Sequence, residues 1–556
     1  MYSSISDLLT VNPRVLLVDE DPEARVSYQA LLMEWGYDPV LAMGRGIALQ
    51  NDARTKAQEH RCSLALIDLR LMDNDDEADI SGLKLAQELK ATRCIAPVIL
   101  SGYESIRVHR LLREDIEIGF IGKQDRRSEI QGKLDGIAAR VCAAKRGLQY
   151  TETEILDEFL QSEIVRQMGV YANQVANVLA RLFPDAKTLG FERLVTPGSS
   201  VSSAIRPNSI VLKVYEDDKE ACVVKMARTS KIKKEADNFR RYISRRFTEG
   251  LSLQQIGKEE LAWDISGIAY TYQGGKNART FTNYYKDRDI ADIREVLSDF
   301  FLAIWQKYYR GGRHNPPPLE KTNTSLYALY TATWGSDWHQ KAREISPQIL
   351  KRIEPFLRTS GLPQPLEWLE NKLSNGDPEF QPVNTVLTAV THGDLHSDNL
   401  LVDDRKNIGV IDYERCGEGH ALQDFIELEA DILNRLQTTA SSHRAYWKMC
   451  LTLFKQDEIR ELEEAETVSA AAHVDKAFKT ISMIRGFAAQ CIPNPNIREY
   501  LTGLLFNMLF RAALVHKEDP QNSERPLVIA GFICHRLDHW NEPWPPAEWN
   551  FSQETL

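Results

Sequence analysis

Short apolar runs recur along the first quarter of the chain, and helix-like stretches separate them. The five runs are Arg14 to Val18, Pro39 to Ala42, Ser63 to Ile67, Pro97 to Leu100 and Ile116 to Ile121. Strand-like runs that alternate with helices predict an α/β domain built on a doubly wound, five-stranded parallel sheet. We place this domain at residues 14–147, after a tail at residues 1–13.

Polar side chains stand where the predicted strands end. They are Asp19, Glu20, Asp68, Ser101 and Lys123. Ligands of such sheets bind beyond the carboxyl ends of the strands, so we expect these side chains to share one site. Three carboxylates at close range repel one another unless a hard cation, usually Mg²⁺, lies among them. A carboxylate such as Asp68 can then accept a phosphoryl group, whose charge Lys123 would balance.

The same segments resemble the receiver domain of bacterial response regulators. The resemblance rests on VLLVDED, ALIDLRL, VILSGY and GFIGK. It implies a flavodoxin-like fold in which a sensor histidine kinase or a phosphotransfer protein phosphorylates Asp68. Asp19, Glu20 and Asp68 would bind Mg²⁺, and Lys123 would contact the phosphoryl group.

Two switch positions and two departures complete this resemblance. Ser101 would be the switch hydroxyl, and Phe120 would be the switch aromatic. Members of the family usually carry proline after the lysine and four residues after the acceptor, where this chain has Gln124 and Met72. The loop that follows Met72 is long and acidic. A receiver-like fold that is used only for docking, without phosphoryl transfer, is the alternative interpretation.

Residues 148–187 show a helical pattern and form a predicted connector. Apolar residues recur there at helical spacing. They are Leu156, Phe159, Leu160, Ile164 and Val165. A helical connector between a receiver and its output domain either packs on the next domain or mediates formation of a homodimer, and both interpretations stay open.

Residues 188–276 are predicted to form a small lobe rich in strands. The strand-like stretches are Phe191 to Val195, Ile210 to Tyr215, Glu220 to Ala227 and Ile268 to Tyr272. Lys225 falls inside the third stretch, where a charge needs a partner. An ATP-binding lysine has such a partner, because it contacts the α- and β-phosphates and a glutamate on a helix. Glu235 occupies the helix that follows.

Two glycine-containing segments of the small lobe are weaker signals. The Ser-rich segment at residues 196–208 contains one glycine, so it is only a weak candidate for a phosphate-binding loop. Gly274 and Gly275 follow the last predicted strand and would form the hinge beside the adenine pocket.

A polar loop, a hairpin and an acid lie close together at residues 391–414. His392 and Asp394 open the loop, Asn399 follows five residues after Asp394, and Asp412 follows thirteen residues after Asn399. Two short strand-like runs between Asn399 and Asp412 predict the hairpin. This order supplies a base and two metal ligands, as in kinase-type phosphotransferases.

A zinc site is one alternative for this loop, because His392 and His396 are four residues apart. The H-E-x-x-H pattern is not met, however, and Gly393 disfavours the helix that such a pair needs. A structural loop with acids placed by chance is the second alternative. The match of three positions at once, Asp394, Asn399 and Asp412, favours phosphoryl transfer over both.

Residues 388–429 resemble the aminoglycoside phosphotransferase and choline/homoserine kinase superfamily, through HGDLHSDNLL and GVIDYE. The resemblance implies a bilobal, kinase-like α+β fold with a large helical lobe at residues 277–556. Asp394 would accept or orient the proton of the acceptor hydroxyl, and His392 would brace the loop. Asn399 and Asp412 would hold Mg²⁺ ions that bridge the ATP phosphates.

One position departs from this second family. The Pro-Gly pair that usually precedes the asparagine is replaced here by Ser397 and Asp398. Asp398 is therefore expected to add an acid near the metal ions, where it would change how they bind.

Bulk composition narrows the choice of function. The net charge of −11 gives no support for nucleic-acid binding. Eight scattered cysteines without a C-x-x-C pair suit the reduced thiols of a cytosolic protein. The first residues lack a basic segment followed by an apolar one, so no signal peptide is expected. No stretch reaches the roughly 20 apolar residues that span a membrane, so we expect a cytoplasmic protein without membrane contact.

Together these features predict a bacterial two-component-type signalling protein. Phosphorylation of Asp68 would regulate an ATP-dependent and Mg²⁺-dependent phosphotransferase that acts on a hydroxyl group of a small molecule or protein. The alternative is an ATP-binding pseudo-enzyme or signalling scaffold that is recruited through the receiver and transfers no phosphoryl group. The acceptor and the direction of regulation stay open.

Overall fold

The computed structural model divides the chain into two compact units, and each is described by itself. Unit 1 comprises residues 1–236 and 255–272, and unit 2 comprises residues 237–254 and 273–556. The structure describes residues 4–73, 76, 78–102, 118–194, 205–206, 209–217, 221–244, 255–271, 278–310, 320–336, 338–345, 347–377, 380, 385–436, 443–462, 472–513, 520–546 and 549.

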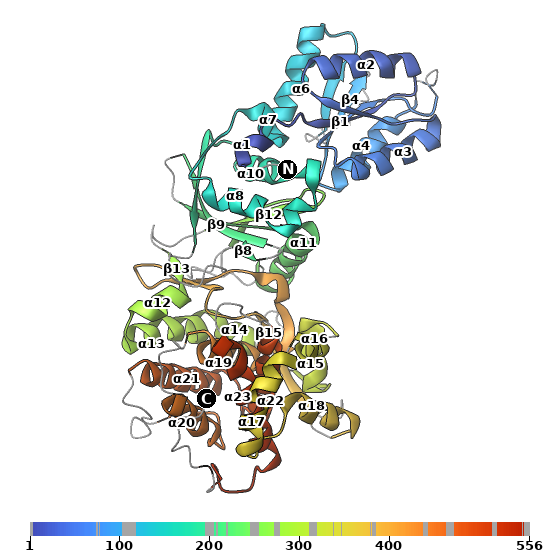
Figure 1. Ribbon diagram of the computed structural model, residues 1–556. Helices are drawn as coiled ribbons and strands as arrows, with labels where there is room; N and C mark the ends of the chain where they lie inside the picture. The colour runs from blue at the N-terminus through green and yellow to red at the C-terminus, as the bar shows by residue number, and fades with distance from the viewer. Residues whose placement is uncertain are drawn as a thin grey trace. The chain divides into compact units, whose positions relative to one another are not determined.

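Unit 1 begins with a five-stranded sheet whose strands are all parallel (Figure 1). Its strands are β1 (Arg14–Val18), β2 (Asp38–Leu41), β3 (Leu64–Asp68), β4 (Ala96–Ser101) and β5 (Gly119–Gly122). They lie in the order β2-β1-β3-β4-β5, which is the flavodoxin-like, doubly wound order. The fold predicted for the N-terminal domain is therefore confirmed.

Helices cover both faces of this sheet. They are α2 (Pro22–Glu34) and α6 (Arg127–Val141) on one face, with α3 (Gly46–Glu59) and α4 (Ser81–Ala91) on the other. Side chains of β1 alternate between the two faces, because neighbouring residues of a strand point in opposite directions. Val15 and Leu17 pack with α2 and α6, whereas Leu16 and Val18 pack with α3 and α4.

The connector consists of short elements rather than one long helix. After α7 (Ala143–Arg146), which ends the receiver, they are β6 (Gln149–Thr151), α8 (Glu154–Leu160), α9 (Glu163–Arg166), η1 (Gly169–Tyr171) and α10 (Gln174–Leu182). Gly169 has a φ of +53°, so a right-handed helix cannot continue through it. The five apolar residues of the predicted pattern are buried in one core with α1 (Ile5–Leu8). That apolar face is therefore used for packing within the chain.

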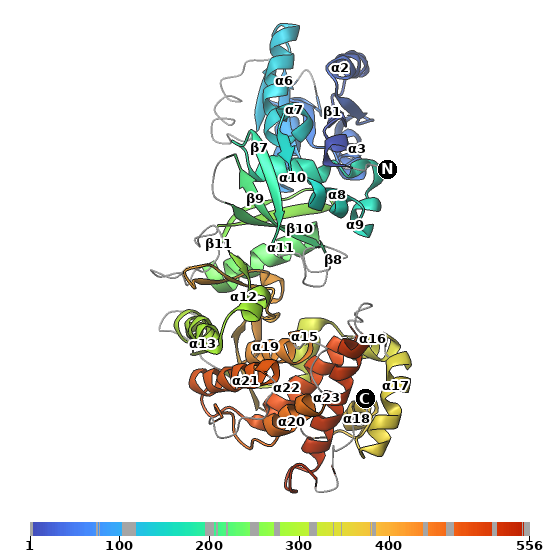
Figure 2. The ribbon, with the colours of Figure 1, turned by 60° about the vertical axis from the view of Figure 1, so that its left-hand side comes forward.

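A second, mostly antiparallel sheet completes unit 1 (Figure 2). Its other strands are β7 (Thr188–Arg193), β8 (Ile205–Arg206), β9 (Ser209–Glu216), β10 (Cys222–Arg228), β11 (Gln255–Glu260) and β12 (Ile265–Thr271). The order is β11-β12-β10-β9-β7-β6, with β8 beside β9. Helix α10 packs closely on β12, since a Cβ at Gly267 would lie 2.7 Å from Val178. Helix α11 (Thr229–Asn238) follows β10.

Unit 2 is mostly helical. Its helices are η2 (Phe239–Ile243), α12 (Phe281–Asp287), α13 (Ile290–Ser298), η4 (Asp299–Trp305), α14 (Gln306–Arg310), α15 (Leu326–Trp334), α16 (Trp338–Ile345), α17 (Pro347–Thr359), α18 (Pro365–Ser374), η6 (Tyr413–Arg415), α19 (Gln423–Asn434), α20 (His443–Phe454), α21 (Ala472–Cys491), α22 (Ile497–Ala512) and α23 (Pro520–Asp538). Every residue of α19 is buried, so this helix forms the centre of the lobe. The large helical lobe predicted from the sequence is confirmed.

Two small sheets frame the predicted catalytic loop in unit 2. One contains β13 (Arg279–Thr280), β16 (Leu400–Val402) and β17 (Ile408–Val410), and the other contains β14 (Glu320–Asn323), β15 (Thr385–Thr391) and β18 (Gly417–His420). The loop leaves β15 and enters the β16–β17 hairpin, which the apolar pattern predicted. Within each sheet all described pairings are antiparallel.

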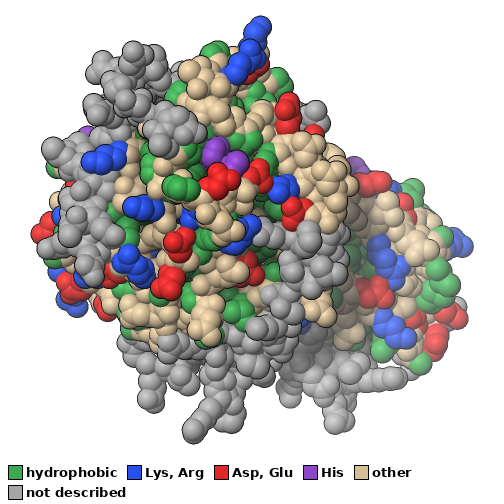
Figure 3. All heavy atoms as spheres, turned by 90° about the horizontal axis from the view of Figure 1, so that it is seen from below, with side chains coloured by type: hydrophobic (Ala, Val, Ile, Leu, Met, Phe, Trp, Pro, Cys, Tyr) green, Lys and Arg blue, Asp and Glu red, His purple; other side chains and the backbone are tan. Residues whose placement is uncertain are grey.

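Some predicted features fall outside the described residues. They are most of the Ser-rich segment, the hinge glycines Gly274 and Gly275, and residues 74, 75 and 77 of the acidic loop. Among the helices that the structure describes, none combines the length and the apolar character needed to cross a membrane. On the face of the molecule drawn in Figure 3, acidic and basic side chains are interspersed.

Candidate active site and receiver site

Two carboxylates and a lysine meet at the carboxyl edge of the receiver sheet. The Nζ atom of Lys123 lies 2.7 Å from Oδ1 of Asp68 and 2.9 Å from Oδ2 of Asp19. Asp68 ends β3 and Asp19 follows β1, and these two strands are parallel neighbours. The parallel pairing therefore brings together three residues that the sequence singled out.

The carboxylates of Asp19, Glu20 and Asp68 repel one another at this edge of the receiver sheet. Burial raises the pKa of Asp68, the charge of Lys123 opposes the shift, and the charge of Asp19 adds to it. Burial, and then the charges of Asp68 and Asp19, raise the pKa of Glu20. A bound cation would relieve this repulsion, so the donor set fits Mg²⁺. In the described part of the chain, however, no three His, Cys, Asp or Glu side chains are already gathered into a metal site.

The switch positions lie beside the same edge. Ser101 ends β4 and is buried, and its backbone oxygen accepts a hydrogen bond of 2.7 Å from the N–H of Lys123. Phe120 on β5 is partly buried and packs against the core beneath α3 and α4. Gln124, which replaces the family's proline, donates a hydrogen bond of 3.3 Å to the oxygen of Gly102.

A buried ion pair joins Lys225 on β10 to Glu235 on α11. The Nζ atom of Lys225 lies 2.7 Å from Oε2 of Glu235, and both side chains are almost completely buried. The hydroxyl of Tyr270 on β12 donates a hydrogen bond to Oε1 of the same glutamate. A charge buried in a strand costs several kcal/mol unless it is paired, and this glutamate supplies the pair. The sequence placed both charges correctly but did not indicate Tyr270.

The catalytic loop turns sharply after β15. Gly393 has a φ of +76°, and a Cβ at this position would lie 2.4 Å from the backbone oxygen of Arg415. A glycine is therefore required here. The neighbouring His392 is completely buried, and its Nε2 atom lies 3.0 Å from the oxygen of Ile411. His392 thus connects the loop to Ile411, the residue before Asp412, and its buried ring fixes the position of the loop.

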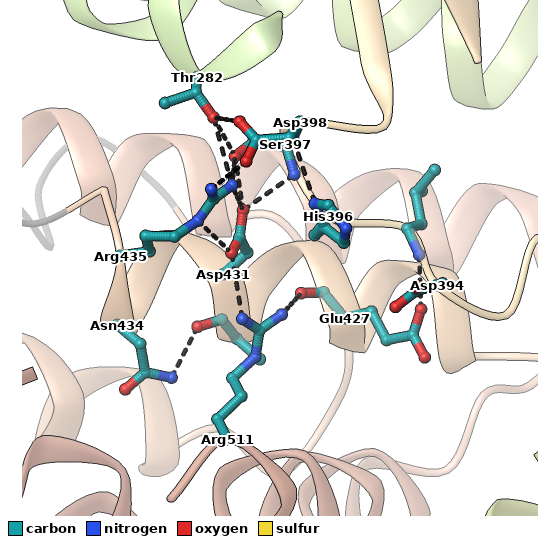
Figure 4. A network of polar contacts seen from close by, with 12 residues as sticks. Thr282, Asp394, His396, Ser397, Asp398, Glu427, Asp431, Asn434, Arg435 and Arg511 are labelled. Atoms are coloured by element: carbon teal, nitrogen blue, oxygen red, sulfur yellow. Dashed lines mark hydrogen bonds and ion pairs between the residues drawn. The ribbon is translucent and has the colours of Figure 1, made fainter. Parts of the chain in front are cut away.

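Three carboxylates of α19 hold the loop from behind, as Figure 4 shows around Glu427 and Asp431. Asp424, Glu427 and Asp431 all accept hydrogen bonds of 2.6 to 3.0 Å from backbone N–H groups of the loop. The donors are His392, Gly393, Leu395 and Ser397. Spacings of three and four residues place the acids on one face of the helix.

Asp398 does not have the role near the metal ions that the sequence suggested. Its carboxylate pairs with Arg435, and Oγ1 of Thr282 donates to it at 2.6 Å (Figure 4). Burial alone would raise the pKa of Asp398, but the charges of Arg435 and His396 and these hydrogen bonds bring it below its ordinary value. The expected extra acid near the metals is therefore neutralised within the protein, and it anchors the loop to α12 and α19.

Asn399 and Asp412 stand at the two ends of the hairpin. The Nδ2 atom of Asn399 donates a hydrogen bond of 2.8 Å to the oxygen of Asp394, and the N–H of Ile411 donates one of 3.0 Å to the oxygen of Asn399. With Nδ2 engaged in this bond, Oδ1 is the side-chain atom of Asn399 that would bind a cation. Asp412 has a φ of +71°, and strained backbone of this kind concentrates at functional sites.

The carboxylate of Asp394 faces a guanidinium group. Nη1 of Arg415 lies 3.1 Å from Oδ1 of Asp394, and both side chains are partly exposed. Behind the loop, burial and then the charges of Asp394 and Asp424 raise the pKa of Glu427 to about 8. Glu427 therefore keeps its proton through much of the neutral range, which limits the negative charge beside Asp394.

Most of the residues that support the loop were not singled out from the sequence. Asp424 belongs to the stretch that resembles the phosphotransferase superfamily, but Glu427, Asp431 and Arg435, which follow it at helical spacing, were missed. Acids on a buried helix face need donors, so this spacing was a usable signal. Thr282 and Arg511 gave no such signal, because they come from elements distant in the sequence.

Comparisons with known proteins give one family match. Residues 318–509 match the family model described as ternary complex associated domain 9. No curated protein matches the chain. A CheY-like response regulator receiver domain protein from Methanospirillum hungatei JF-1 is similar in structure, with 20% sequence identity and a TM-score of 0.18. That similarity covers 22% of this chain and 92% of that chain.

Two phosphotransferase structures are also similar to this chain. One is a thermostable variant of aminoglycoside phosphotransferase APH(4)-Ia in complex with ADP and hygromycin B, with 13% identity, a TM-score of 0.35 and coverage of 64% of this chain and 96% of that chain. The other is a GDP complex of an aminoglycoside 2'-phosphotransferase-IIIa variant, with 12% identity, a TM-score of 0.35 and coverage of 66% and 99%. The chain thus contains a receiver fold, shown by its sheet order, and a kinase-like fold with a buried lysine–glutamate pair and a helical lobe.

Proposed function

We propose that this protein is an ATP-dependent and Mg²⁺-dependent phosphotransferase that acts on a hydroxyl group and is regulated by phosphorylation of Asp68. The observation that carries the proposal is the construction of the catalytic loop. Hydrogen bonds of 2.8 and 3.0 Å link Asp394 to Asn399 and Asn399 to the residue before Asp412. Such fixed placement of a base and two metal ligands is what phosphoryl transfer requires of a protein.

Each residue of the loop has a distinct task in this proposal. Asp394 orients the acceptor hydroxyl and receives its proton, and Asn399 and Asp412 bind the metal ions. When bound, Mg²⁺ and ATP supply the phosphoryl group and the positive charge that stabilises its transfer. Lys225, held by Glu235, contacts the nucleotide phosphates. His392 and the acids of α19 keep the loop in place.

The receiver has its own chemistry. Asp68 accepts a phosphoryl group from a sensor histidine kinase or a phosphotransfer protein, with Mg²⁺ held by Asp19, Glu20 and Asp68. The raised pKa values of Asp68 and Glu20 support a cation here, because burial and mutual repulsion both disfavour ionised acids that lack one. Lys123 then moves its contact from the carboxylates to the phosphoryl oxygens.

A scaffold that binds ATP without transferring a phosphoryl group is the second candidate. The contact of 3.1 Å between Arg415 and Asp394 favours it, because an ion-paired carboxylate is a weaker base. In that case nucleotide binding would depend on Lys225 and Asp412, but no acceptor would be phosphorylated.

Turnover by the purified full-length protein separates these candidates. ADP release would be measured with Mg²⁺–ATP and a broad panel of hydroxyl compounds, for the wild type and for Asp394→Asn. We expect acceptor-dependent turnover in the wild type and a loss of about 10²-fold or more in the variant, with ATP affinity preserved. If both proteins bind ATP but neither shows turnover, the ATP-binding scaffold is the remaining candidate.

A further inference from the structure

Two arginines of the receiver bind the small lobe at the edge of the sheet opposite Asp68. Arg61, which precedes β3, makes two contacts with the carboxylate of Asp264, of 2.9 and 3.1 Å. Arg93, which precedes β4, lies 3.3 Å from the carboxylate of Glu259 and donates a hydrogen bond of 2.7 Å to its backbone oxygen. We call these four residues the arginine clamp.

The backbone of both arginines is unusual. Arg61 has a φ of +51° and Arg93 has a φ of +60°. This left-handed conformation costs free energy for any residue that has a Cβ, and glycine adopts it most readily. Arginine nevertheless stands at both positions, and both side chains contact the small lobe. Both strained turns therefore carry an arginine side chain that contacts the small lobe.

The turn between β11 and β12 is the element that the clamp holds. The indole of Trp263 donates a hydrogen bond of 2.9 Å to the oxygen of Cys62, and its ring packs against the receiver core. Gln174 of α10 exchanges two hydrogen bonds of 2.9 Å with the backbone and the carboxylate of Asp264. The receiver is therefore docked on the small lobe through this turn, beyond its covalent connector.

The same turn supports the start of α11. The N–H of Thr229, the first residue of α11, donates a hydrogen bond of 2.9 Å to the oxygen of Asp264. The hydroxyl of Thr229 donates one of 2.7 Å to the oxygen of Ala262. Glu235, the partner of Lys225, lies on this helix. One residue, Asp264, thus touches the receiver through its side chain and α11 through its backbone.

Two regular elements lead from Asp68 to the clamp. Strand β3 begins just after Arg61 and ends at Asp68 itself. Helix α4 begins against the acceptor loop, where the N–H of Gly82 donates to the oxygen of Leu69 at 2.9 Å, and a Cβ at Gly82 would lie 1.8 Å from the oxygen of Asp68. This helix ends two residues before Arg93.

We propose that the arginine clamp is the output surface of the receiver. A change at Asp68 shifts β3 against α4, which moves Arg61 and Arg93. That movement changes how firmly the Asp264 turn holds the start of α11, and so how well Glu235 is placed. Coupling of this kind needs an element that both sites bias, and α11 is that element. The first step, a phosphoryl group on Asp68, and the last, an effect on nucleotide binding, rest on the proposed function, whereas the clamp and its contact with α11 do not.

Amide hydrogen exchange of α11 in the full-length protein tests the clamp directly. The variant is Arg61→Gly combined with Arg93→Gly, because glycine removes both contacts while it suits the left-handed backbone. The matched control is Arg54→Ala, which removes an arginine that pairs with Glu88 inside the receiver. Each protein would be measured alone and with Mg²⁺ and beryllofluoride, a stand-in for the phosphoryl group on Asp68.

We expect α11 amides of the double variant to exchange roughly twofold to fivefold faster than those of the wild type, the factor that partly exposed ion pairs contribute. Beryllofluoride should change α11 exchange in the wild type and in the Arg54→Ala control, but not in the double variant. Unchanged α11 exchange in the double variant would overturn the proposal. A beryllofluoride response that survives loss of the clamp, or one that is missing in the wild type, would overturn it as well.

ATP titration calorimetry on the same proteins distinguishes this inference from the proposed function. If α11 responds as expected but no protein binds ATP, the clamp stands and the phosphotransferase proposal fails. If all proteins bind ATP with equal affinity and α11 exchange is also unchanged, the clamp fails while nucleotide binding stands. Should the double variant fold poorly by circular dichroism, the single Arg61→Gly variant provides the same comparison, since the Arg61 side chain is 29% exposed.

Discussion

Acids gather in two places in this chain, and their surroundings differ. At the carboxyl edge of the receiver sheet, Asp19 and Asp68 face each other with the ammonium of Lys123 between them. Each of these two acids also accepts one backbone N–H, from a residue two positions further along the same loop. Behind the catalytic loop, Asp424, Glu427 and Asp431 of α19 instead accept backbone N–H groups from residues 31 to 34 positions away. The hydrogen bonds of the receiver acids are therefore local, whereas those of the α19 acids tie two distant segments together.

The difference separates a site that changes state from one that keeps a shape. Carboxylates that repel one another are stabilised by whatever cation or phosphoryl group arrives, so their arrangement responds to a ligand. Carboxylates that each satisfy a backbone donor fix the loop to the helix, and a buried network with all its partners present is rigid. The receiver edge should therefore respond to Mg²⁺, and the α19 acids should respond to mutation mainly through stability.

Loss of Asp431 should have the largest effect on stability. Asp431→Ala removes the acceptor for the Ser397 N–H and the partner of Arg435 and Arg511, which then lie partly buried without it. We expect a loss of about 3–5 kcal/mol in the free energy of unfolding. Urea denaturation measures it, and Glu354→Ala, in an exposed ion pair on α17, is the control with an expected loss of about 1 kcal/mol or less. Equal losses in the two variants would contradict a structural role for the α19 acids.

Loss of Asp19 should weaken the receiver edge toward Mg²⁺ and leave its fold intact. Asp19→Asn removes one of the carboxylates whose repulsion a cation relieves, so the Mg²⁺ concentration needed for phosphorylation of Asp68 by acetyl phosphate should rise on the order of tenfold, about 1.4 kcal/mol. Chelation of Mg²⁺ should stop the reaction. Asp52→Asn, at a surface ion pair of α3, should leave the requirement unchanged. Phosphorylation without any divalent cation would contradict a metal site.

The pH dependence of stability should reveal Glu427. Burial and the charges of Asp394 and Asp424 raise its pKa from 4.5 to about 8, so the folded protein holds a proton that the unfolded chain releases. This group therefore lowers stability as the pH rises from about 4.5 to 8. In Glu427→Gln that part of the decline should disappear, as thermal unfolding between pH 5 and pH 8 would show. Parallel curves for wild type and variant would show that Glu427 is ionised in the folded state.

Loss of the Asp398 charge should affect stability but not metal binding. Asp398→Asn keeps an oxygen for Thr282 but loses the charge opposite Arg435, so the free energy of unfolding should fall by about 1–3 kcal/mol. The Mg²⁺ dependence of ATP binding should not change, because the carboxylate is already neutralised within the protein. A changed Mg²⁺ requirement would show instead that Asp398 takes part in metal binding.

The sequence predicted the receiver fold well, because its strands are buried and apolar on both faces. Val15 to Val18 and Leu64 to Ile67 give continuous apolar runs, and each run ends at a polar residue. The small lobe was harder to predict. Strand β11 has the sequence QIGKEE, which carries three charges and too few apolar residues for a strand pattern, and it forms through its pairing with β12.

The candidate site was predictable where its residues lie close together in the chain. Asp394, Asn399 and Asp412 share one loop and hairpin, so their spacing could be seen directly. The arginine clamp could not be seen in this way, because Arg61 and Asp264 are 203 residues apart and meet only in the folded chain. The predicted connector helix is interrupted at several places, and the left-handed backbone at Gly169 is the physical cause of one of them.

The most direct test of the link between the two phosphoryl sites is single-turnover transfer from ATP labelled at the γ-phosphate. The rate would be measured in the wild type, Asp68→Asn and Asp394→Asn, each with and without Mg²⁺–beryllofluoride on the receiver. We expect beryllofluoride to change the wild-type rate and to leave the Asp68→Asn rate unchanged. We expect Asp394→Asn to transfer at least about 10²-fold more slowly than the wild type. Identical wild-type rates with and without beryllofluoride, or transfer by Asp394→Asn at the wild-type rate, would contradict a phosphotransferase controlled by its receiver.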